Sequence, residues 1–164
     1  GGLSAWKAAG APVTDAESTV TPRTFRGVRR PELLRSTADV AAALDDPSTL
    51  LVNVLDEATY RGETTTYARQ GHIPGSVNVP VFSIRDAETG DLRSVDTLRQ
   101  EFEAAALLDD DIKVVTYCGG GIAATGIAHA LALVGRDDVA VYDGSMTAWA
   151  NDPSLPLVTG AEPR

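Results

Sequence analysis

One stretch decides the fold: Val114-Val115-Thr116-Tyr117-Cys118-Gly119-Gly120-Gly121-Ile122-Ala123-Ala124. Residues 114–117 form a run of apolar and β-favouring side chains, which predicts a buried strand. Three glycines then predict a sharp turn, and a helix is expected from Gly121 to Leu133, with Gly135 as its stop. A strand, a turn and a helix in this order are typical of α/β sheets, in which ligands bind at the carboxyl ends of the strands. Cys118 occupies that place.

Cys118 is the candidate catalytic residue, because its surroundings stabilise negative charge. Consecutive glycines let successive backbone N–H groups point into one anion-binding nest, and the helix start adds about half a positive charge. We expect the thiol to exist largely as the nucleophilic thiolate, and the same N–H groups to hold a persulfide anion once sulfur is bound. This cradle is expected from the backbone of Gly119, Gly120, Gly121, Ile122, Ala123 and Ala124. A buried structural cysteine is the alternative, although packing alone does not explain so costly a run of glycines.

Strands and helices alternate on both sides of this loop. Apolar runs at residues 50–54, 76–79 and 139–142 predict three more strands, and a fifth is expected near residues 33–35. Helices are predicted from Ser36 or Thr37 to Leu44, ahead of Pro47, and from Ser94 to about Leu107. The pattern predicts an α/β fold with a five-stranded parallel sheet flanked by helices on both faces.

Three other chemistries use a glycine-rich loop of this kind. A cysteine phosphatase has an arginine six positions after its nucleophile, where this chain has Ala124. A nucleotide P-loop closes on Gly-Lys-Ser/Thr, and no lysine follows Cys118. A dinucleotide-binding motif, G-x-G-x-x-A, matches residues 119–124, with Asp143 at the end of the next predicted strand. It is disfavoured because a dinucleotide site uses the first strand–helix–strand unit of its sheet, whereas only one strand follows here.

Composition excludes several classes of partner. The 164 residues include 23 acidic and 14 basic side chains, for a net charge of −9, and no cluster of lysine and arginine matches a nucleic-acid backbone. No apolar run approaches the length of a transmembrane helix, about 18 residues. A single cysteine forms neither an intramolecular disulfide nor a Cys/His zinc site. We therefore expect a cytoplasmic protein with no metal, no cofactor, no nucleic-acid partner and no membrane contact.

The two ends of the chain resemble each other. Residues 1–6 (GGLSAW) match residues 144–149 (GSMTAW) in register, and Pro12-Val13 matches Pro156-Leu157. This repetition predicts that residues 1–13 are the C-terminal tail of a preceding copy of the same domain. A linker is then expected at residues 14–30, the domain itself at 31–158 and a C-terminal tail at 159–164. Chance similarity between short Gly/Ala-rich segments is the alternative.

Three motifs follow one another in the predicted domain. They are residues 71–80 (GHIPGSVNVP), the cysteine loop at 115–124, and Tyr142-Asp143-Gly144-Ser145 with Trp149. Together they resemble the rhodanese family of thiosulfate and 3-mercaptopyruvate sulfurtransferases. The resemblance implies a ping-pong reaction, in which Cys118 takes sulfane sulfur from a small donor and its persulfide passes the sulfur to a thiol or cyanide. It also implies that the chain is the C-terminal, catalytic domain of a two-domain protein, with the N-terminal rhodanese domain of the same chain as its partner.

Some residues depart from the family pattern. The cysteine loop has neither the hydroxyl groups of Cys-Gly-Ser-Gly-Val-Thr nor a positive charge, and Thr59 stands where an arginine usually binds substrate. Arg61 or Arg69 is expected to supply the missing charge, unless both are solvated loop residues. His72, in a tight turn, and His129, far along the predicted helix, are not expected to act in catalysis. A rhodanese-like module that binds a partner or regulates without catalysis is therefore the alternative function.

Overall fold

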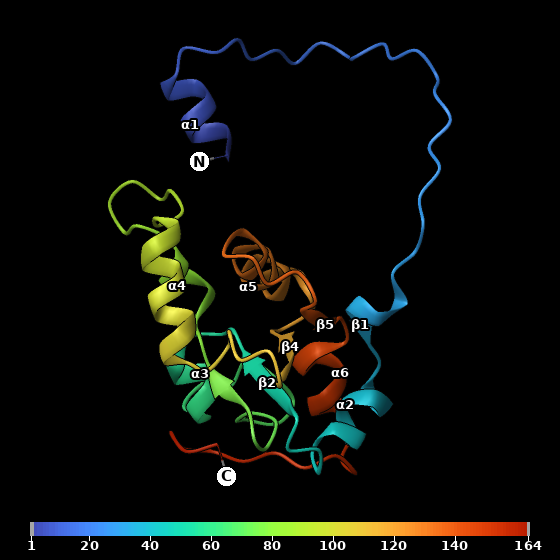
Figure 1. The fold of residues 1–164 in the computed structure, drawn as a ribbon, viewed down its shortest axis with the longest axis vertical. Helices are drawn as coiled ribbons and strands as arrows, with labels where there is room; N and C mark the ends of the chain where they lie inside the picture. Colours follow the sequence, from blue (N-terminus) through green and yellow to red (C-terminus); the bar gives the residue numbers. More distant parts are fainter. Residues whose placement is uncertain (1, 164) are drawn as a thin grey trace.

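The strand that precedes Cys118 lies at the centre of a five-stranded parallel sheet in the computed structural model, which describes residues 2–163 (Figure 1). The strand order is β1-β5-β4-β2-β3. Their bounds are β1 (Leu34–Arg35), β2 (Thr49–Asn53), β3 (Val77–Asn78), β4 (Lys113–Tyr117) and β5 (Ala140–Tyr142). All four neighbouring pairs are parallel, so the predicted α/β fold with a five-stranded parallel sheet is confirmed.

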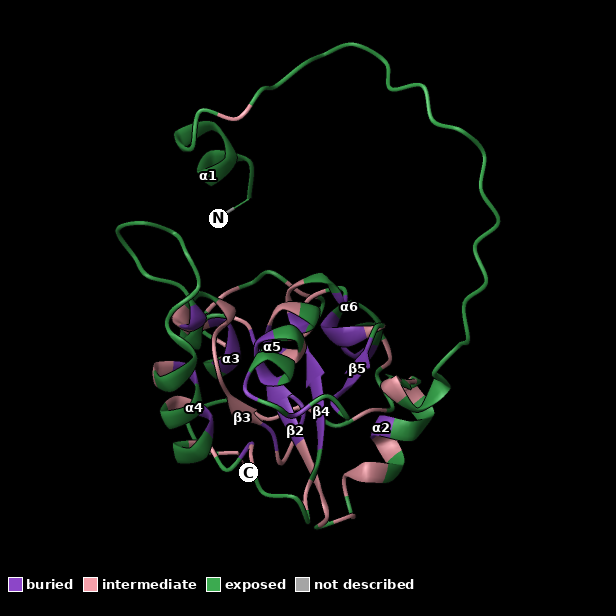
Figure 2. Cartoon of the chain, turned by 45° about the horizontal axis from the view of Figure 1, so that its top comes forward, coloured by how far each residue is buried: buried purple, intermediate pink, exposed green. Residues whose placement is uncertain are grey.

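Helices cover both faces of the sheet. Alternate residues of a strand point to opposite faces, so Val114 belongs to one buried cluster whereas Val115 and Tyr117 belong to the other. The first cluster includes residues of α4 (Val95–Ala104), α5 (Ile122–Leu133) and the 3-10 turn η2 (Val81–Ile84). The second cluster includes residues of α2 (Thr37–Ala43) and α6 (Ser145–Asn151). Figure 2 shows β4, β5 and the end of β2 as buried strands in the middle of the body, whereas β3 is of intermediate burial.

Hydrogen-bonded caps fix where two of the predicted helices begin. The Ser36 hydroxyl accepts from the N–H of Asp39, whose carboxylate accepts from the N–H of Ser36, which is a complete capping box for α2. The Ser94 hydroxyl accepts from the N–H of Thr97 and begins α4 in the same manner. Both helices therefore begin where the sequence predicts.

The end of α4 differs from the prediction. The helix ends at Ala104 rather than near Leu107, because Ala106 adopts a positive φ of 57° and the chain then turns to bury Leu107. The guanidinium group of Arg136, itself buried, stabilises this turn by donating to the carbonyls of Leu107, Asp109 and Ile112. This contact from a distant part of the chain ends the helix early.

Three short elements complete the fold, and the sequence predicts none of them as a helix. They are the 3-10 turn η1 (Pro31–Leu33), α3 (Glu57–Arg61) and α6. The carboxylate of Asp56 caps α3 at its start, and Gly62 ends it with a φ of 81°. Because α3 and α6 follow β2 and β5, both lie at the carboxyl edge of the sheet, beside the cysteine loop.

The two terminal segments differ in how they contact the body. Residues 2–30, which include α1 (Gly2–Ala8), lie apart from the sheet, and α1 has no buried residue (Figures 1 and 2). By contrast, residues 159–163 lie against it: the N–H of Gly160 donates to the Arg61 carbonyl, and the N–H of Gly75 donates to the Pro163 carbonyl. Within residues 2–163, no helix is long and apolar enough to cross a membrane.

Candidate active site

The cysteine loop joins the central strand to a helix with a buried thiol between them. Cys118 follows β4 directly, and its accessible fraction is only 3%. Gly121 precedes α5 with a φ of 80°, a conformation that favours glycine. A β-carbon at Gly121 would also lie 2.5 Å from Oδ1 of Asp143. The turn therefore requires glycine here both for its backbone conformation and for the space beside Asp143.

Ser145 holds the loop in place. Its buried hydroxyl accepts from the N–H groups of Cys118 at 3.0 Å and Gly121 at 3.2 Å, and donates to the Tyr142 carbonyl at 2.7 Å. The φ of Ser145 is 48°, so a non-glycine residue occupies the left-handed region to make these contacts. The sequence places Ser145 in the closing motif without assigning it a role; its place just after β5, the neighbour of β4, is the signal that could have revealed one.

Further hydrogen bonds from α6 anchor the loop carbonyls. The N–H of Met146 donates to the Cys118 carbonyl at 3.0 Å. The Gly119 carbonyl accepts from both the N–H and the hydroxyl of Thr147, at 2.9 and 2.7 Å. Residues at the start of α6 therefore engage two carbonyls of the loop in addition to the two N–H groups that Ser145 accepts from.

The backbone N–H groups expected to form the anion cradle differ in whether they are already engaged. Among residues 2–163, no acceptor is hydrogen-bonded to the N–H groups of Gly119, Gly120, Ile122 or Ala123. The N–H of Gly121 is engaged by Ser145 and is not available to an anion, which corrects the expectation that every residue from 119 to 124 contributes. The free donors lie at the start of the twelve-residue α5, where the helix dipole favours negative charge.

A pocket of about 530 Å³ opens over the cysteine. Apolar side chains dominate its wall, with one cation and one hydroxyl group among them. The lining residues are Leu55, Tyr67, Val81, Phe82, Arg85, Cys118, Gly119, Gly120, Ile122 and Ala123. The sequence interpretation missed Tyr67 and Arg85, because each belongs to a loop that only the tertiary fold brings to Cys118.

Neither of the two expected arginines lines this pocket. Arg61 pairs with Glu57 at 2.9 Å, and both side chains lie on the exposed side of α3. Arg69 donates to the carbonyls of Trp149, Ala150, Asp152 and Leu155, at the end of α6 and just beyond it. The geometry therefore favours Arg85 over both as the cation that meets a bound anion.

The two histidines lie away from the pocket. His72 is fully buried, its ring stacks on Tyr60 with centroids 3.7 Å apart, and Nδ1 lies 2.8 Å from the Tyr60 carbonyl. Burial lowers the pKa of His72 below its ordinary value, so the ring is neutral near pH 7. His129 is exposed on α5. In the described part of the chain, no group of three or more His, Cys, Asp and Glu side chains could hold a metal ion.

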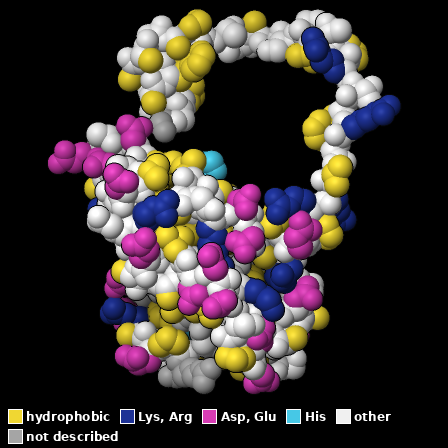
Figure 3. Space-filling view, viewed as in Figure 1, with side chains coloured by type: hydrophobic (Ala, Val, Ile, Leu, Met, Phe, Trp, Pro, Cys, Tyr) yellow, Lys and Arg dark blue, Asp and Glu magenta, His cyan; other side chains and the backbone are white. Residues whose placement is uncertain are grey.

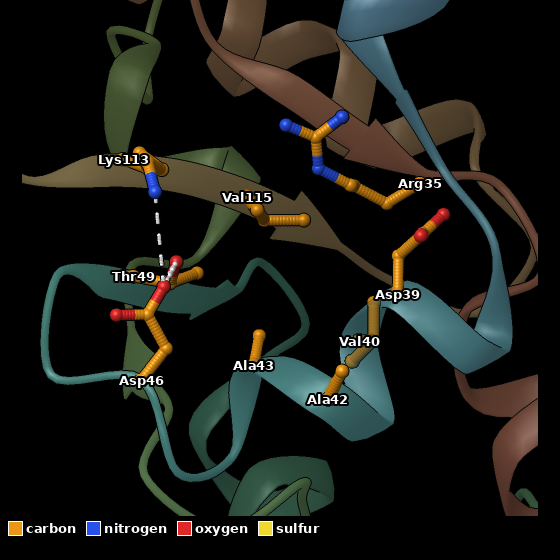
Figure 4. Close-up of a pocket in the computed structure, with 9 residues that line it drawn as sticks. All are labelled: Arg35, Asp39, Val40, Ala42, Ala43, Asp46, Thr49, Lys113 and Val115. Carbon is orange, nitrogen blue, oxygen red and sulfur yellow. Dashed lines mark hydrogen bonds and ion pairs between the residues drawn. The ribbon is translucent and has the colours of Figure 1, made fainter.

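A second hollow lies at the opposite edge of the sheet (Figure 4). Lys113 and Asp46 form an ion pair of 3.8 Å across it. The other two charged groups are also engaged, Asp39 by Ser36 and Arg35 by backbone carbonyls. Because ligands of parallel sheets bind at the carboxyl ends of the strands, the Cys118 pocket is the better candidate.

Comparison with known proteins agrees with this geometry. Residues 36–152 match the family described as rhodanese-like domain. The chain belongs to this family. A probable 3-mercaptopyruvate sulfurtransferase of Pseudomonas aeruginosa is 34% identical over 161 residues, which cover 98% of this chain and 56% of the relative. Bovine thiosulfate sulfurtransferase is 33% identical over 153 residues, 91% of this chain and 51% of the relative. This rhodanese-like chain thus spans about half the length of these relatives.

Solved structures support the fold. An anaerobic ergothioneine biosynthesis enzyme from Chlorobium limicola superposes with a TM-score of 0.82 at 24% identity, over 94% of this chain and 39% of that one. At this identity the similarity concerns the rhodanese-like fold alone.

Proposed function

We propose that this chain is a sulfurtransferase domain that carries sulfur as a persulfide on Cys118. The observation that carries the proposal is a buried thiol at the end of the central strand, beside four backbone N–H groups with no other acceptor in residues 2–163. Such donors stabilise a thiolate before reaction and a persulfide anion after it. The names of the relatives, which are sulfurtransferases for 3-mercaptopyruvate or thiosulfate, support the same chemistry.

The proposed reaction is ping-pong. In the loading step, the Cys118 thiolate attacks the outer sulfur of the donor, a new S–S bond forms, and the donor fragment leaves with the electron pair of the broken bond. In the second step, a thiol or cyanide attacks the outer sulfur of the persulfide, and the Cys118 thiolate leaves. No external base is required, because the cysteine enters and leaves as an anion.

Arg85 is the proposed electrostatic anchor for an anionic donor. It is the one cation among the residues that line the Cys118 pocket, and its side chain is exposed. Within residues 2–163, its guanidinium group makes one hydrogen bond, a long one of 3.5 Å to the Gly90 carbonyl, which leaves most of its donors for a ligand. Thiosulfate and 3-mercaptopyruvate are both anions, so Arg85 can anchor either donor.

We also propose that residues 1–13 are the closing segment of a preceding rhodanese-like domain, joined by a linker at 14–30. In α1, Trp6 Nε1 donates to the Pro12 carbonyl at 2.9 Å, and in α6 Trp149 Nε1 donates to the Pro156 carbonyl at 2.8 Å. Trp149 is fully buried, whereas 53% of Trp6 is exposed. Figure 3 shows hydrophobic side chains gathered on this isolated helix. An apolar helix face of this kind is explained if another domain body covers it.

Steady-state sulfur transfer to cyanide tests the proposed function. We expect thiocyanate to form with thiosulfate or 3-mercaptopyruvate, and turnover to disappear in Cys118→Ser, which keeps the side-chain size but is a far weaker nucleophile. Wild-type protein that produces no thiocyanate with either donor would refute the proposal and favour a rhodanese-like binding or regulatory module. Turnover that persists in Cys118→Ser would refute the assignment of the nucleophile.

A further inference from the structure

Tyr67 reaches the cysteine pocket from the loop between α3 and β3. Its ring is half-buried, and its hydroxyl group lies directly over the backbone of Gly119. A β-carbon at Gly119 would lie 2.3 Å from the Tyr67 oxygen and 3.3 Å from Cζ. The glycine at position 119 therefore makes room for this hydroxyl beside Cys118.

The Tyr67 hydroxyl has no hydrogen-bond partner among residues 2–163, unlike those of the other tyrosines. The hydroxyl groups of Tyr60, Tyr117 and Tyr142 each lie 2.6 to 2.8 Å from a partner. Tyr67 is also the only hydroxyl-bearing residue among those that line the Cys118 pocket. A free polar group therefore faces an otherwise largely apolar wall, where a ligand would meet it.

The hydroxyl is in the form that donates. Burial raises the pKa of Tyr67 above its ordinary value of 10.0, and the nearby Cys118 and Asp56 raise it further. The phenol is therefore protonated near pH 7 and can donate to an anion. The loop from Cys118 to Ala124 has no hydroxyl group of its own, so Tyr67 supplies the one side-chain hydroxyl of the pocket.

We propose that Tyr67 is a catalytic residue that donates a hydrogen bond to the leaving fragment of the sulfur donor. With thiosulfate, the Sγ–S bond forms, the S–S bond of the donor breaks, and sulfite leaves with the electron pair. With 3-mercaptopyruvate, the C–S bond breaks, Cys118 gains the sulfur as a hydropersulfide, and the pyruvate enolate leaves and takes a proton from water. In both reactions negative charge is carried by oxygen atoms of the leaving fragment, and a fixed donor at that position lowers the barrier.

This inference rests on the proposed function, and the loading step tests it directly. Wild-type protein and Tyr67→Phe are mixed with each donor, and the appearance of the persulfide is followed by quenched-flow mass spectrometry. We expect the limiting rate of loading to fall roughly 10- to 100-fold, between the contributions of an ordinary hydrogen bond and of an oxyanion-hole donor. The loss should lie in the limiting rate rather than in the half-saturating donor concentration, because the bond strengthens as charge develops.

Two further variants separate this role from a structural one. Tyr142→Phe removes a hydroxyl outside the pocket, where it contacts Thr37, and should load at the wild-type rate. Gly119→Ala keeps the phenol of Tyr67 but displaces it, and should lower the limiting rate of loading by a similar factor. Adding Gly119→Ala to Tyr67→Phe should not lower the rate further, because both changes remove the same hydrogen bond. Alkylation of Cys118 by iodoacetamide, whose leaving iodide needs no hydrogen bond, should proceed at the same rate in Tyr67→Phe as in wild type.

The outcomes are distinct. Loading of Tyr67→Phe within twofold of wild type with both donors would overturn the role of Tyr67 and leave the proposed function intact. An equal fall in loading and alkylation would overturn it as well, because the change would then be in the cysteine itself. Wild-type protein that gains no sulfur from either donor would refute the proposed function, and this inference with it.

Discussion

Replacing Ser145 by alanine should weaken the whole cysteine loop. The substitution leaves the buried N–H groups of Cys118 and Gly121 without their shared acceptor and removes the donor to the Tyr142 carbonyl. An unsatisfied buried polar group costs about 1–3 kcal/mol, so the two N–H groups alone predict a loss of about 2–4 kcal/mol after some relaxation. For a chain of this size, that loss corresponds to a fall of roughly 4–16 °C in Tm.

Urea denaturation of Ser145→Ala and of a control, Ser154→Ala, measures this loss. The Ser154 hydroxyl contacts Asp152 on the exposed surface, and its removal should change the free energy of unfolding by no more than about 0.5 kcal/mol. We also expect Ser145→Ala to load sulfur more slowly, because the N–H groups of the loop lose their fixed orientation. If the free energy of unfolding of Ser145→Ala lies within about 1 kcal/mol of that of the control, the assignment of Ser145 as the support of the loop is wrong.

Three other predictions follow from the described contacts. Trp149→Ala should lower the free energy of unfolding by about 3–5 kcal/mol. Trp6→Ala should change it by less than about 0.5 kcal/mol, because α1 packs against no part of the body. Equal losses in urea denaturation would contradict the separation of α1 from the body. Arg85→Ala should raise the half-saturating thiosulfate concentration about twofold to fivefold, and less in high salt; an unchanged value in steady-state assays would remove Arg85 from donor binding. Burial lowers the pKa of His72 below 6.5, so the unfolded chain binds more protons below that pH and stability should fall as the pH decreases from 6.5. Thermal melts at a series of pH values measure this effect. The dependence of Tm on pH should be weaker in His72→Asn and unchanged when the exposed His129 is replaced. If Tm depends on pH in His72→Asn as it does in wild type, another group is responsible.

The sequence predicts the centre of this fold because the signals there are local. The apolar run of β4, the three glycines and the apolar helix that follows are adjacent in sequence, so the place of Cys118 could be predicted without knowledge of tertiary contacts. The short helices α3 and α6 could not, because five and seven residues give too little periodicity to recognise. Likewise, the early end of α4 depends on Arg136, which lies about thirty residues away in the chain.

The residues around the thiol were harder to predict than the thiol itself. The family resemblance favours Arg61 and Arg69 near the site, but Glu57 engages Arg61, and carbonyls at the end of α6 engage Arg69. Tyr67 and Arg85 reach the pocket from two different loops, and neither has a neighbouring motif that indicates this. Parallel strands place their carboxyl ends at one edge, so Ser145, just after the neighbouring strand β5, is the one support that topology alone could have suggested.

The most direct test of the central claim is the intact mass of the protein before and after exposure to a sulfur donor. We predict that wild-type protein gains the mass of one sulfur atom from thiosulfate or 3-mercaptopyruvate, and that cyanide removes this sulfur as one equivalent of thiocyanate. Cys118→Ser should gain none. A wild-type protein that stays unmodified, or a variant that gains the same mass, would contradict the assignment of Cys118 as the sulfur carrier.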